Sequence, residues 1–126
     1  MAVSLIVALD DSGAIGYQEG LPWPKNSEDL KWFREITMGK VCIVGFHTNK
    51  TLPNLPGRTV VMMPRGMTPE QVMQVWEGED IMVIGGAKTY RQWLPYVDRF
   101  YISRIRGEYP ADTYCKELAP WLKNEN

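Results

Sequence analysis

The sequence predicts an α/β fold in one domain, with a mostly parallel central sheet of about five strands and flanking helices. Short apolar runs rich in Val, Ile and Leu recur along the chain and alternate with segments of helical pattern. Such alternation indicates parallel strands joined by helical crossovers. The 126 residues are enough for one hydrophobic core and too few for two. The expected strands are Ala2–Leu9, Lys40–Gly45, Thr59–Met63, Ile81–Ile84 and Phe100–Ile105.

Charge and composition exclude several classes of function. The net charge is −1 and the basic residues are scattered, so the electrostatic footprint of a nucleic-acid-binding protein is missing. No apolar run has the length of a membrane-spanning helix, and no basic leader or cleavage site precedes the first strand. Cys42 and Cys115 lie outside any metal-ligand spacing and are expected to be free thiols. We therefore expect a cytoplasmic protein that contacts neither membranes nor nucleic acids.

The first strand, Ala2–Leu9, leads into a glycine-rich segment. Asp10–Gly20 contains three glycines and is expected to be a loop, with Ile15 and Gly16 at its centre. Loops of this kind carry function when a rigid sheet holds their ends. We expect this loop to close over a ligand.

An acid among aromatic residues follows that loop. Pro22 and Pro24 bracket Trp23 and hold it on an extended segment, after which Asn26 or Ser27 is expected to cap a helix that runs to about Met38. On this helix Asp29 and Phe33 are neighbours, and Leu30 and Ile36 continue the apolar stripe. The helix dipole alone would favour Glu28 and Asp29 as surface residues. Asp29 in register with Phe33 favours a functional acid instead, because a carboxylate there is costly without a partner.

The second strand ends in Gly45, and a helix that starts at His47 and Thr48 would direct its first N–H groups to the same edge of the sheet as other strand ends. His47 is the single histidine, either a surface residue or a contact to a phosphate. The third strand, Thr59–Met63, follows a turn at Pro53, Asn54, Pro56 and Gly57, and we expect it to be buried.

A capping box opens the next helix. Thr68 and Gln71 have the required spacing, Pro69 occupies the first helical position, and Gly78 ends the segment. We expect its inner face to be formed by Val72, Val75 and Trp76, and its role to be structural.

Two glycines stand between the fourth strand and a helix expected over Ala87–Leu94, halted by Pro95. Gly85 and Gly86 would let the backbone approach a ligand and leave N–H groups free at a positive helix end, which suits a pyrophosphate. Glycine at this turn is equally compatible with close packing alone. The three spaced glycines of the Rossmann fingerprint are absent, which disfavours that fold.

Two arginines are further candidate ligand contacts. Arg58 could clamp a carboxylate and Arg65 could bind a phosphate, or both could be solvated.

Taken together, these motifs resemble the dihydrofolate reductase family over nearly the whole chain. The similarity implies that family's three-layer fold. The motifs, in the family's order, are Ile6 to Ala8, Ile15-Gly16, LPW at Leu21–Trp23, Asp29 with Phe33, GFHT at Gly45–Thr48, LPGR at Leu55–Arg58, VIGGAKTY at Val83–Tyr90, Ser103, and ADTY at Ala111–Tyr114.

The resemblance implies reduction of 7,8-dihydrofolate to 5,6,7,8-tetrahydrofolate by hydride transfer from NADPH. Asp29 would hold the amino-pyrimidine edge of the pterin and favour protonation of the ring nitrogen beside the carbon that receives hydride. A carboxylate among Trp23, Leu30 and Phe33 suits that role, because a low dielectric strengthens binding of a cationic edge. Ser103, in place of a more usual threonine, would position a water or the pterin amino group. The implied catalytic set is Asp29, Trp23 and Ser103.

The same resemblance assigns the two binding regions. Arg58 would pair with the carboxylate of the glutamate tail, and Leu55 would line the benzoyl pocket. The substrate-binding residues are Ile6, Val7, Leu30, Phe33, Leu55, Arg58, Ile84 and Tyr90. The cofactor-binding residues are Ala8, Ile15, Gly16, Gly45, Phe46, His47, Thr48, Met63, Pro64, Arg65, Gly85, Gly86, Ala87, Lys88 and Thr89.

Three departures from the family pattern change these expectations. Phe46 replaces an arginine often found beside the 2′-phosphate, so preference for NADPH over NADH depends on compensation by Arg65. The segment between Pro64 and Ile81 has room for a helix but little for an extra edge strand. After ADTY the closing hairpin is expected to be absent, leaving a brief helical tail over Lys116–Lys123. The strand Phe100–Ile105 would then be a bare edge, and we expect two copies to pair there in a symmetric homodimer.

Two other functions are compatible with this sequence. One is a catalytically weak or inactive module that binds a nucleotide or folate on the same fold. Asp29, Trp23 and Arg58 together disfavour it, since a scaffold needs none of them. The other is a related pyrimidine or pterin reductase, in which the pairing of Asp29 with Arg58 is not expected.

Overall fold

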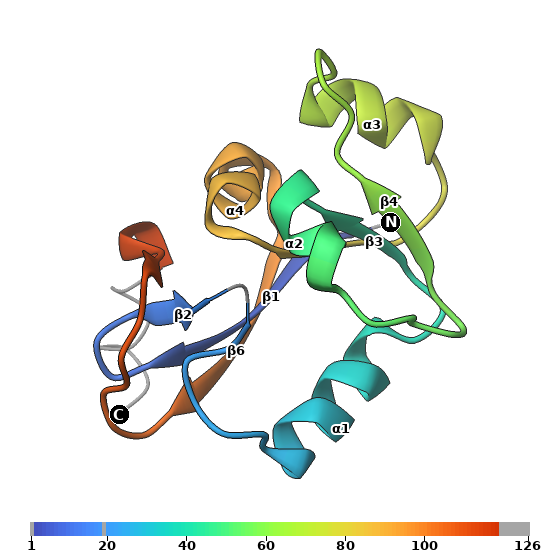
Figure 1. The fold of residues 1–126 in the computed structure, drawn as a ribbon. Coiled ribbons are helices and arrows are strands. Elements are labelled where there is room, and N and C mark those ends of the chain that lie inside the picture. Colours follow the sequence, from blue (N-terminus) through green and yellow to red (C-terminus); the bar gives the residue numbers. More distant parts are fainter. Residues whose placement is uncertain (1, 19, 119–126) are drawn as a thin grey trace.

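The computed structural model describes residues 2–18 and 20–118, which are built around one parallel sheet (Figure 1). Its five strands stand in the order β4-β3-β5-β1-β6, and every neighbouring pair is parallel. The expectation of a mostly parallel five-stranded sheet is confirmed. The strands are β1 (Val3–Asp10), β3 (Val41–Val44), β4 (Thr59–Met62), β5 (Ile81–Gly85) and β6 (Arg99–Ile105).

Helices connect these strands, and a second, small sheet lies beside β1 (Figure 1). The helices are α1 (Ser27–Thr37), α2 (Phe46–Thr51), α3 (Pro69–Val75) and α4 (Ala87–Trp93), with 3₁₀ turns at Leu94–Tyr96 and Lys116–Leu118. The small sheet pairs β2 (Ala14–Gly16) with β7 (Thr113–Tyr114) in antiparallel fashion. The segment Asp10–Gly20, expected to be a loop, therefore contains a short strand, because β7 supplies a partner that is distant in sequence.

Side chains alternate between the two faces of the sheet and form two separate cores. Leu5, Val7 and Leu9 of β1 pack with side chains of α3 and α4, including Val72 and Trp93. Ile6 of β1 packs in the other core, against Trp32, Phe33 and Ile36 of α1. The sheet thus lies between α1 on one face and α3 with α4 on the other, which confirms the three-layer arrangement.

Helix starts follow local sequence rules. Asn26 caps α1 by accepting a hydrogen bond from the N–H of Asp29 at 3.1 Å. At α3 both bonds of the capping box are present, between Thr68 and Gln71.

The inner face expected for α3 is wrong at Val75, which is 66% exposed. Val72 is buried and Trp76 is partly buried on the same face, whereas Val75 points away from it.

Two further expectations need correction. The apolar run at β4 was expected to be a buried strand, but β4 is an edge strand, and Val60 and Met62 are exposed. An apolar run alone does not distinguish a central strand from an edge strand.

The helix expected over Ala87–Leu94 ends at Trp93, and the next turn is a 3₁₀ helix that contains Pro95.

The remaining expectations concern the chain end and membranes. Phe100–Ile105 lies in β6, at the edge of the sheet, as expected. Of the helical tail expected over Lys116–Lys123, the first turn is a 3₁₀ helix, and the part beyond Leu118 lies outside the described residues. Across the described residues, no helix has the length and apolar character needed to cross a membrane.

The turns after β3 and β5 are packed against each other, which gives a test of this part of the fold. A Cβ atom on Gly45 would lie 2.5 Å from Oγ1 of Thr89, so Gly45→Ala forces a shift. We expect Gly45→Ala to lower the free energy of unfolding by about 1–3 kcal/mol, measured by urea denaturation. Thr89→Ala in the same chain should restore part of that loss. Equal losses with and without Thr89→Ala would contradict this packing.

Candidate active site

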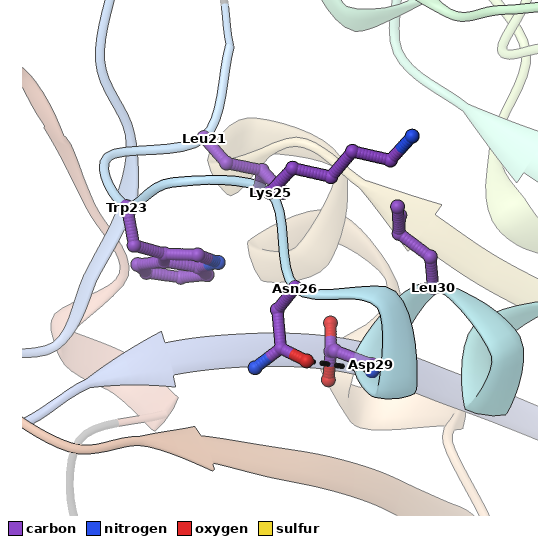
Figure 2. A pocket seen from close by; sticks show the side chains of 6 residues that line it. All are labelled: Leu21, Trp23, Lys25, Asn26, Asp29 and Leu30. Carbon is purple, nitrogen blue, oxygen red and sulfur yellow. Dashed lines mark hydrogen bonds between the residues drawn. The ribbon is translucent and has the colours of Figure 1, made fainter.

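A cavity of about 230 Å³ lies at the start of α1. Figure 2 shows the Trp23 ring on one side and Asp29 on the other, with Asn26 between them. Trp23, Asp29 and Leu30 were expected to be site residues, and the structure brings them together here. The sequence analysis missed Lys25 and Leu21 as wall residues and identified Asn26 only as a cap. The full lining is Leu21, Trp23, Lys25, Asn26, Asp29 and Leu30.

Asp29 is placed by the cap of α1. Its N–H is held by Asn26, so the residue is fixed in the first helical turn while its side chain stays available. The side chain is half-buried, and within the described residues its carboxylate has no hydrogen-bond or ion-pair partner. A partly desolvated, unpaired carboxylate in a cavity is suited to bind a group that donates two hydrogen bonds.

Trp23 supplies a second unsatisfied polar group. It is 6% exposed, and within the described part of the chain its Nε1 has no hydrogen-bond partner. The nitrogen end of the ring is turned toward Asn26 (Figure 2). The ring of Tyr109 contacts the indole edge-on, with the centroids 6.2 Å apart. Because buried donors are nearly always paired in folded proteins, this N–H at the cavity wall suits a hydrogen-bond acceptor on a bound ligand.

The apolar face beneath α1 contains most of the remaining predicted substrate residues. Ile6, Phe33, Leu55 and Ile84 belong to one core, between the sheet and α1. Leu30 does not continue that stripe: it is 42% exposed and forms the cavity wall instead.

Two predicted substrate residues have side chains in the other layer. Val7 and Tyr90 belong to the core under α4, so Val7 can reach the α1 side only through its backbone. The Tyr90 hydroxyl lies 2.8 Å from the Ile6 carbonyl oxygen and 3.1 Å from that of Ile84, and donates its proton to one of them. Burial raises the pKa of Tyr90 far above its ordinary value, so the hydroxyl stays protonated.

Arg58 is held at the far end of α1. Its Nη1 donates to Oγ1 of Thr37 at 3.3 Å and its Nε donates to the Pro56 carbonyl at 3.2 Å. The guanidinium keeps further N–H groups for a ligand. Ser103 lies in β6, where it is paired with Ala8 of β1 and is half-buried.

The glycine turns after β3 and β5 adjoin one another. The Gly45 N–H donates to the Gly85 carbonyl at 2.7 Å. A Cβ on Gly86 would lie 2.8 Å from Oγ1 of Thr48, so only glycine fits this close approach without a shift. Gly45 and Gly86 are the N-caps of α2 and α4, and neither cap has a side chain over the helix's first N–H groups. Ala87 and Thr89 are buried behind the turn, and Lys88 is exposed.

The carboxyl end of β4 also lies in this region. The Met63 N–H donates to the Val44 carbonyl at 2.8 Å, which places Met63, Pro64 and Arg65 beside the end of β3. Most residues expected to contact a cofactor therefore gather at the carboxyl ends of β3, β4 and β5.

An aromatic and basic group stands on α2. His47 contacts the exposed ring of Phe46 edge-on at 5.3 Å, and the Lys50 ammonium lies 4.5 Å from the centroid of that ring. Sequence reasoning missed Lys50, although its spacing of four residues from Phe46 on a helix was a usable signal.

The strand β2 carries Ile15 and Gly16, which were expected to close over a ligand. Ile15 packs partly on the core under α4. The Gly16 carbonyl accepts the N–H of Asp112 at 3.0 Å, and the Asp112 carboxylate accepts the N–H of Gln18 at 2.8 Å. The bond from Gln18 lowers the pKa of Asp112. Asp112 lies in the quoted ADTY motif, but no sequence rule indicated that it ties this segment down.

The chain is similar to characterised dihydrofolate reductases in sequence. Residues 2–125 match the family model described as dihydrofolate reductase. The chain is 32% identical to the dihydrofolate reductase of Haemophilus influenzae, over 94% of this chain and 81% of that protein. It is 34% identical to that of Bacillus subtilis, over 92% of this chain and 76% of that protein.

A solved structure shows the same fold. It is a dihydrofolate reductase from Enterococcus faecalis, complexed with NADP(H) and RAB-propyl. The TM-score is 0.80 at 24% identity, over 90% of this chain and 76% of that one.

Proposed function

The chain belongs to the dihydrofolate reductase family, and we propose that Asp29 anchors 7,8-dihydrofolate for its reduction to 5,6,7,8-tetrahydrofolate with NADPH. The observation that carries this proposal is that the Asp29 carboxylate and the Trp23 N–H, neither of which has a partner among the described residues, line one cavity.

Asp29 fits the amino-pyrimidine edge of a pterin. That edge presents an amino group and a ring N–H side by side, and a carboxylate accepts both hydrogen bonds at once. The negative charge also favours the protonated form of the bound ring and so supports proton transfer to the nitrogen beside the reacting carbon. Trp23 Nε1 would donate from the same wall to the carbonyl oxygen of the pterin or to a water next to that oxygen. Ser103, on β6, would position a water or the pterin amino group.

The rest of the substrate would follow α1. The apolar side chains of Ile6, Phe33 and Leu55 suit an aromatic ring that leaves the cavity past Leu30. Arg58, oriented by Thr37 and Pro56, retains N–H groups for the carboxylate of a glutamate tail.

The two glycine turns fit the cofactor. A Cβ at Gly45 or Gly86 would collide with Thr89 or Thr48, so only glycine allows the two turns to pack this closely, and their backbone N–H groups would face a pyrophosphate. When bound, NADPH supplies the hydride. Thr48, Lys88 and Thr89 would border the pyrophosphate, and Ile84 with the backbone near Tyr90 would adjoin the reacting end.

Replacing the acid tests its role. We expect Asp29→Asn to lower kcat/KM for dihydrofolate by roughly 100-fold or more, measured from loss of NADPH absorbance, because the charge that favours ring protonation is removed. The fold should be unchanged, since it is the N–H of Asp29 that bonds Asn26. The matched control is Glu28→Gln, which neutralises the exposed acid next to it. Equal rates for the parent and Asp29→Asn would remove Asp29 from the mechanism.

The side chains of Phe46, His47 and Lys50 on α2 predict a preference for NADPH over NADH. NADPH differs from NADH by a 2′-phosphate, and Lys50, held over Phe46, can supply the cation that Phe46 lacks. We expect Lys50→Met to raise KM for NADPH by about 2- to 5-fold, the worth of one exposed ion pair, and to leave KM for NADH unchanged. Arg65→Met tests the other cation, and Lys31→Met on α1 is the control. Equal effects on both cofactors would contradict a phosphate contact.

We further propose that the protein is cytoplasmic and pairs with a second copy through β6. In the described sheet β6 is bonded to β1 alone, and its half-buried residues include Tyr101 and Ile102. Edge strands of this kind pair readily with another strand. A twofold axis across β6 would extend the sheet through both copies.

Sedimentation velocity at micromolar concentration tests this pairing. We expect a dimer for the parent and a monomer for Ile105→Lys, because a buried charge at the edge opposes strand pairing. Val60→Lys places the same charge on β4, the opposite edge, and should remain dimeric. A monomeric parent, or dissociation by Val60→Lys alone, would exclude the β6 interface.

A further inference from the structure

A buried carboxylate lies outside the cavity and has no role in the chemistry described above. Asp10 is the last residue of β1 and is fully buried, with 0% exposure. A charge in that position is costly unless hydrogen bonds compensate for the lost water. Its partners therefore show what the residue holds in place.

The two oxygens of Asp10 bind two different segments. Oδ1 accepts the Ser12 N–H at 2.8 Å, the Ser12 hydroxyl at 2.7 Å and the Ala14 N–H at 2.9 Å. Oδ2 accepts the Tyr109 N–H at 3.0 Å. Burial by itself raises the pKa of Asp10, but these donors outweigh it and hold the pKa below its ordinary value. The carboxylate therefore remains charged and joins the segment after β1 to the segment after β6.

The second of these segments reaches Trp23. Tyr109, whose backbone is fixed by Asp10, places its ring edge-on against the indole. Asp11 supports the same region, because its carboxylate accepts the Gly107 N–H at 2.8 Å. Asp10 is thus linked to the wall of the cavity through one backbone bond and one ring contact.

We propose that Asp10 is a positioning residue for the reductase reaction, which fixes Tyr109 and thereby holds the Trp23 ring in the cavity wall. This inference rests on the function proposed above. It makes the geometry at the substrate depend on a carboxylate that touches neither substrate nor cofactor.

A purely structural role is the competing explanation, and the chain contains a matched control for it. Asp98 lies at the other end of β1, where its Oδ2 accepts the Val3 N–H at 3.0 Å. Like Asp10 it holds a backbone N–H across two segments, but it has no link to Trp23. Asp98→Ala, which removes the acceptor, therefore reports the effect of losing such a bond on stability alone.

The decisive variant is Asp10→Asn. Its amide oxygen can still accept from Ser12 and Ala14, but its amide nitrogen cannot accept from Tyr109. We expect kcat to fall about 10-fold with KM for NADPH unchanged. The emission of Trp23, obtained by subtracting the spectrum of the same chain carrying Trp23→Phe, should shift, and it should shift without substrate. Asp98→Ala should lower stability and leave both readouts unchanged.

Tyr109→Ala keeps the backbone bond to Asp10 and removes only the ring. We expect it to reproduce the fall in kcat and the emission shift, and Asp10→Asn combined with it should cause no further loss. Should Asp10→Asn not fold, the Tyr109→Ala shift in Trp23 emission tests the ring contact in a chain with an intact carboxylate.

Three results would overturn the proposal. They are unchanged kcat and Trp23 emission in Asp10→Asn, losses that multiply in the double variant, or no emission shift in Tyr109→Ala. Failure of the reductase function itself looks different: the parent would show no NADPH oxidation, while the emission measurements would still report the Asp10 linkage.

Discussion

The parallel direction of all five strands is the constraint on which the site depends. It brings the ends of β3, β4 and β5 to one edge, where two glycine turns lie in contact and, among the described residues, no cap side chain bonds the first N–H groups of α2 and α4. The same pairing places β1 beside β5, so that the Tyr90 hydroxyl can reach carbonyls of both strands. The proposed substrate and cofactor sides thus both adjoin β1 and β5, although α1 and α4 lie on opposite faces.

Two groups without partners among the described residues, the Asp29 carboxylate and Trp23 Nε1, lie at the proposed substrate end, whereas Nε1 of Trp93, which also has none there, is buried in the core under α4. Asp10 and Asp98, which have no part in the chemistry, accept backbone N–H groups that compensate them. Asp29 and Trp23 Nε1 have no such partners within the described residues, and both line one cavity. Leaving them unpaired costs stability in the free protein, and a ligand that pairs both recovers that cost on binding. Carboxylates that accept backbone N–H groups thus hold segments of the fold together, whereas the Asp29 carboxylate is available to bind a ligand.

Local rules in the sequence predicted much of this arrangement. The Asn26 cap places Asp29, the capping box starts α3, and Gly85 with Gly86 mark the turn after a buried strand, because each depends on residues within a few positions. Contacts between distant segments were not predictable in this way. The edge position of β4, the exposure of Val75, the pairing of β2 with β7 and the contact of Tyr109 with Trp23 all depend on which segments the fold brings together. Lys50 is an intermediate case. Its spacing from Phe46 was visible in the sequence, but its proposed contact with the 2′-phosphate depends on the neighbouring turns.

The proposed site therefore combines one carboxylate in the first turn of α1 with two glycine turns that would seat the cofactor. A crystal structure of the protein with folate and NADP⁺ tests this most directly. We expect both oxygens of Asp29 to lie within hydrogen-bond distance of the amino-pyrimidine edge, and the pyrophosphate to lie against Gly86. A pterin bound elsewhere, with Asp29 in solvent, would contradict it and leave only the fold in common with the family.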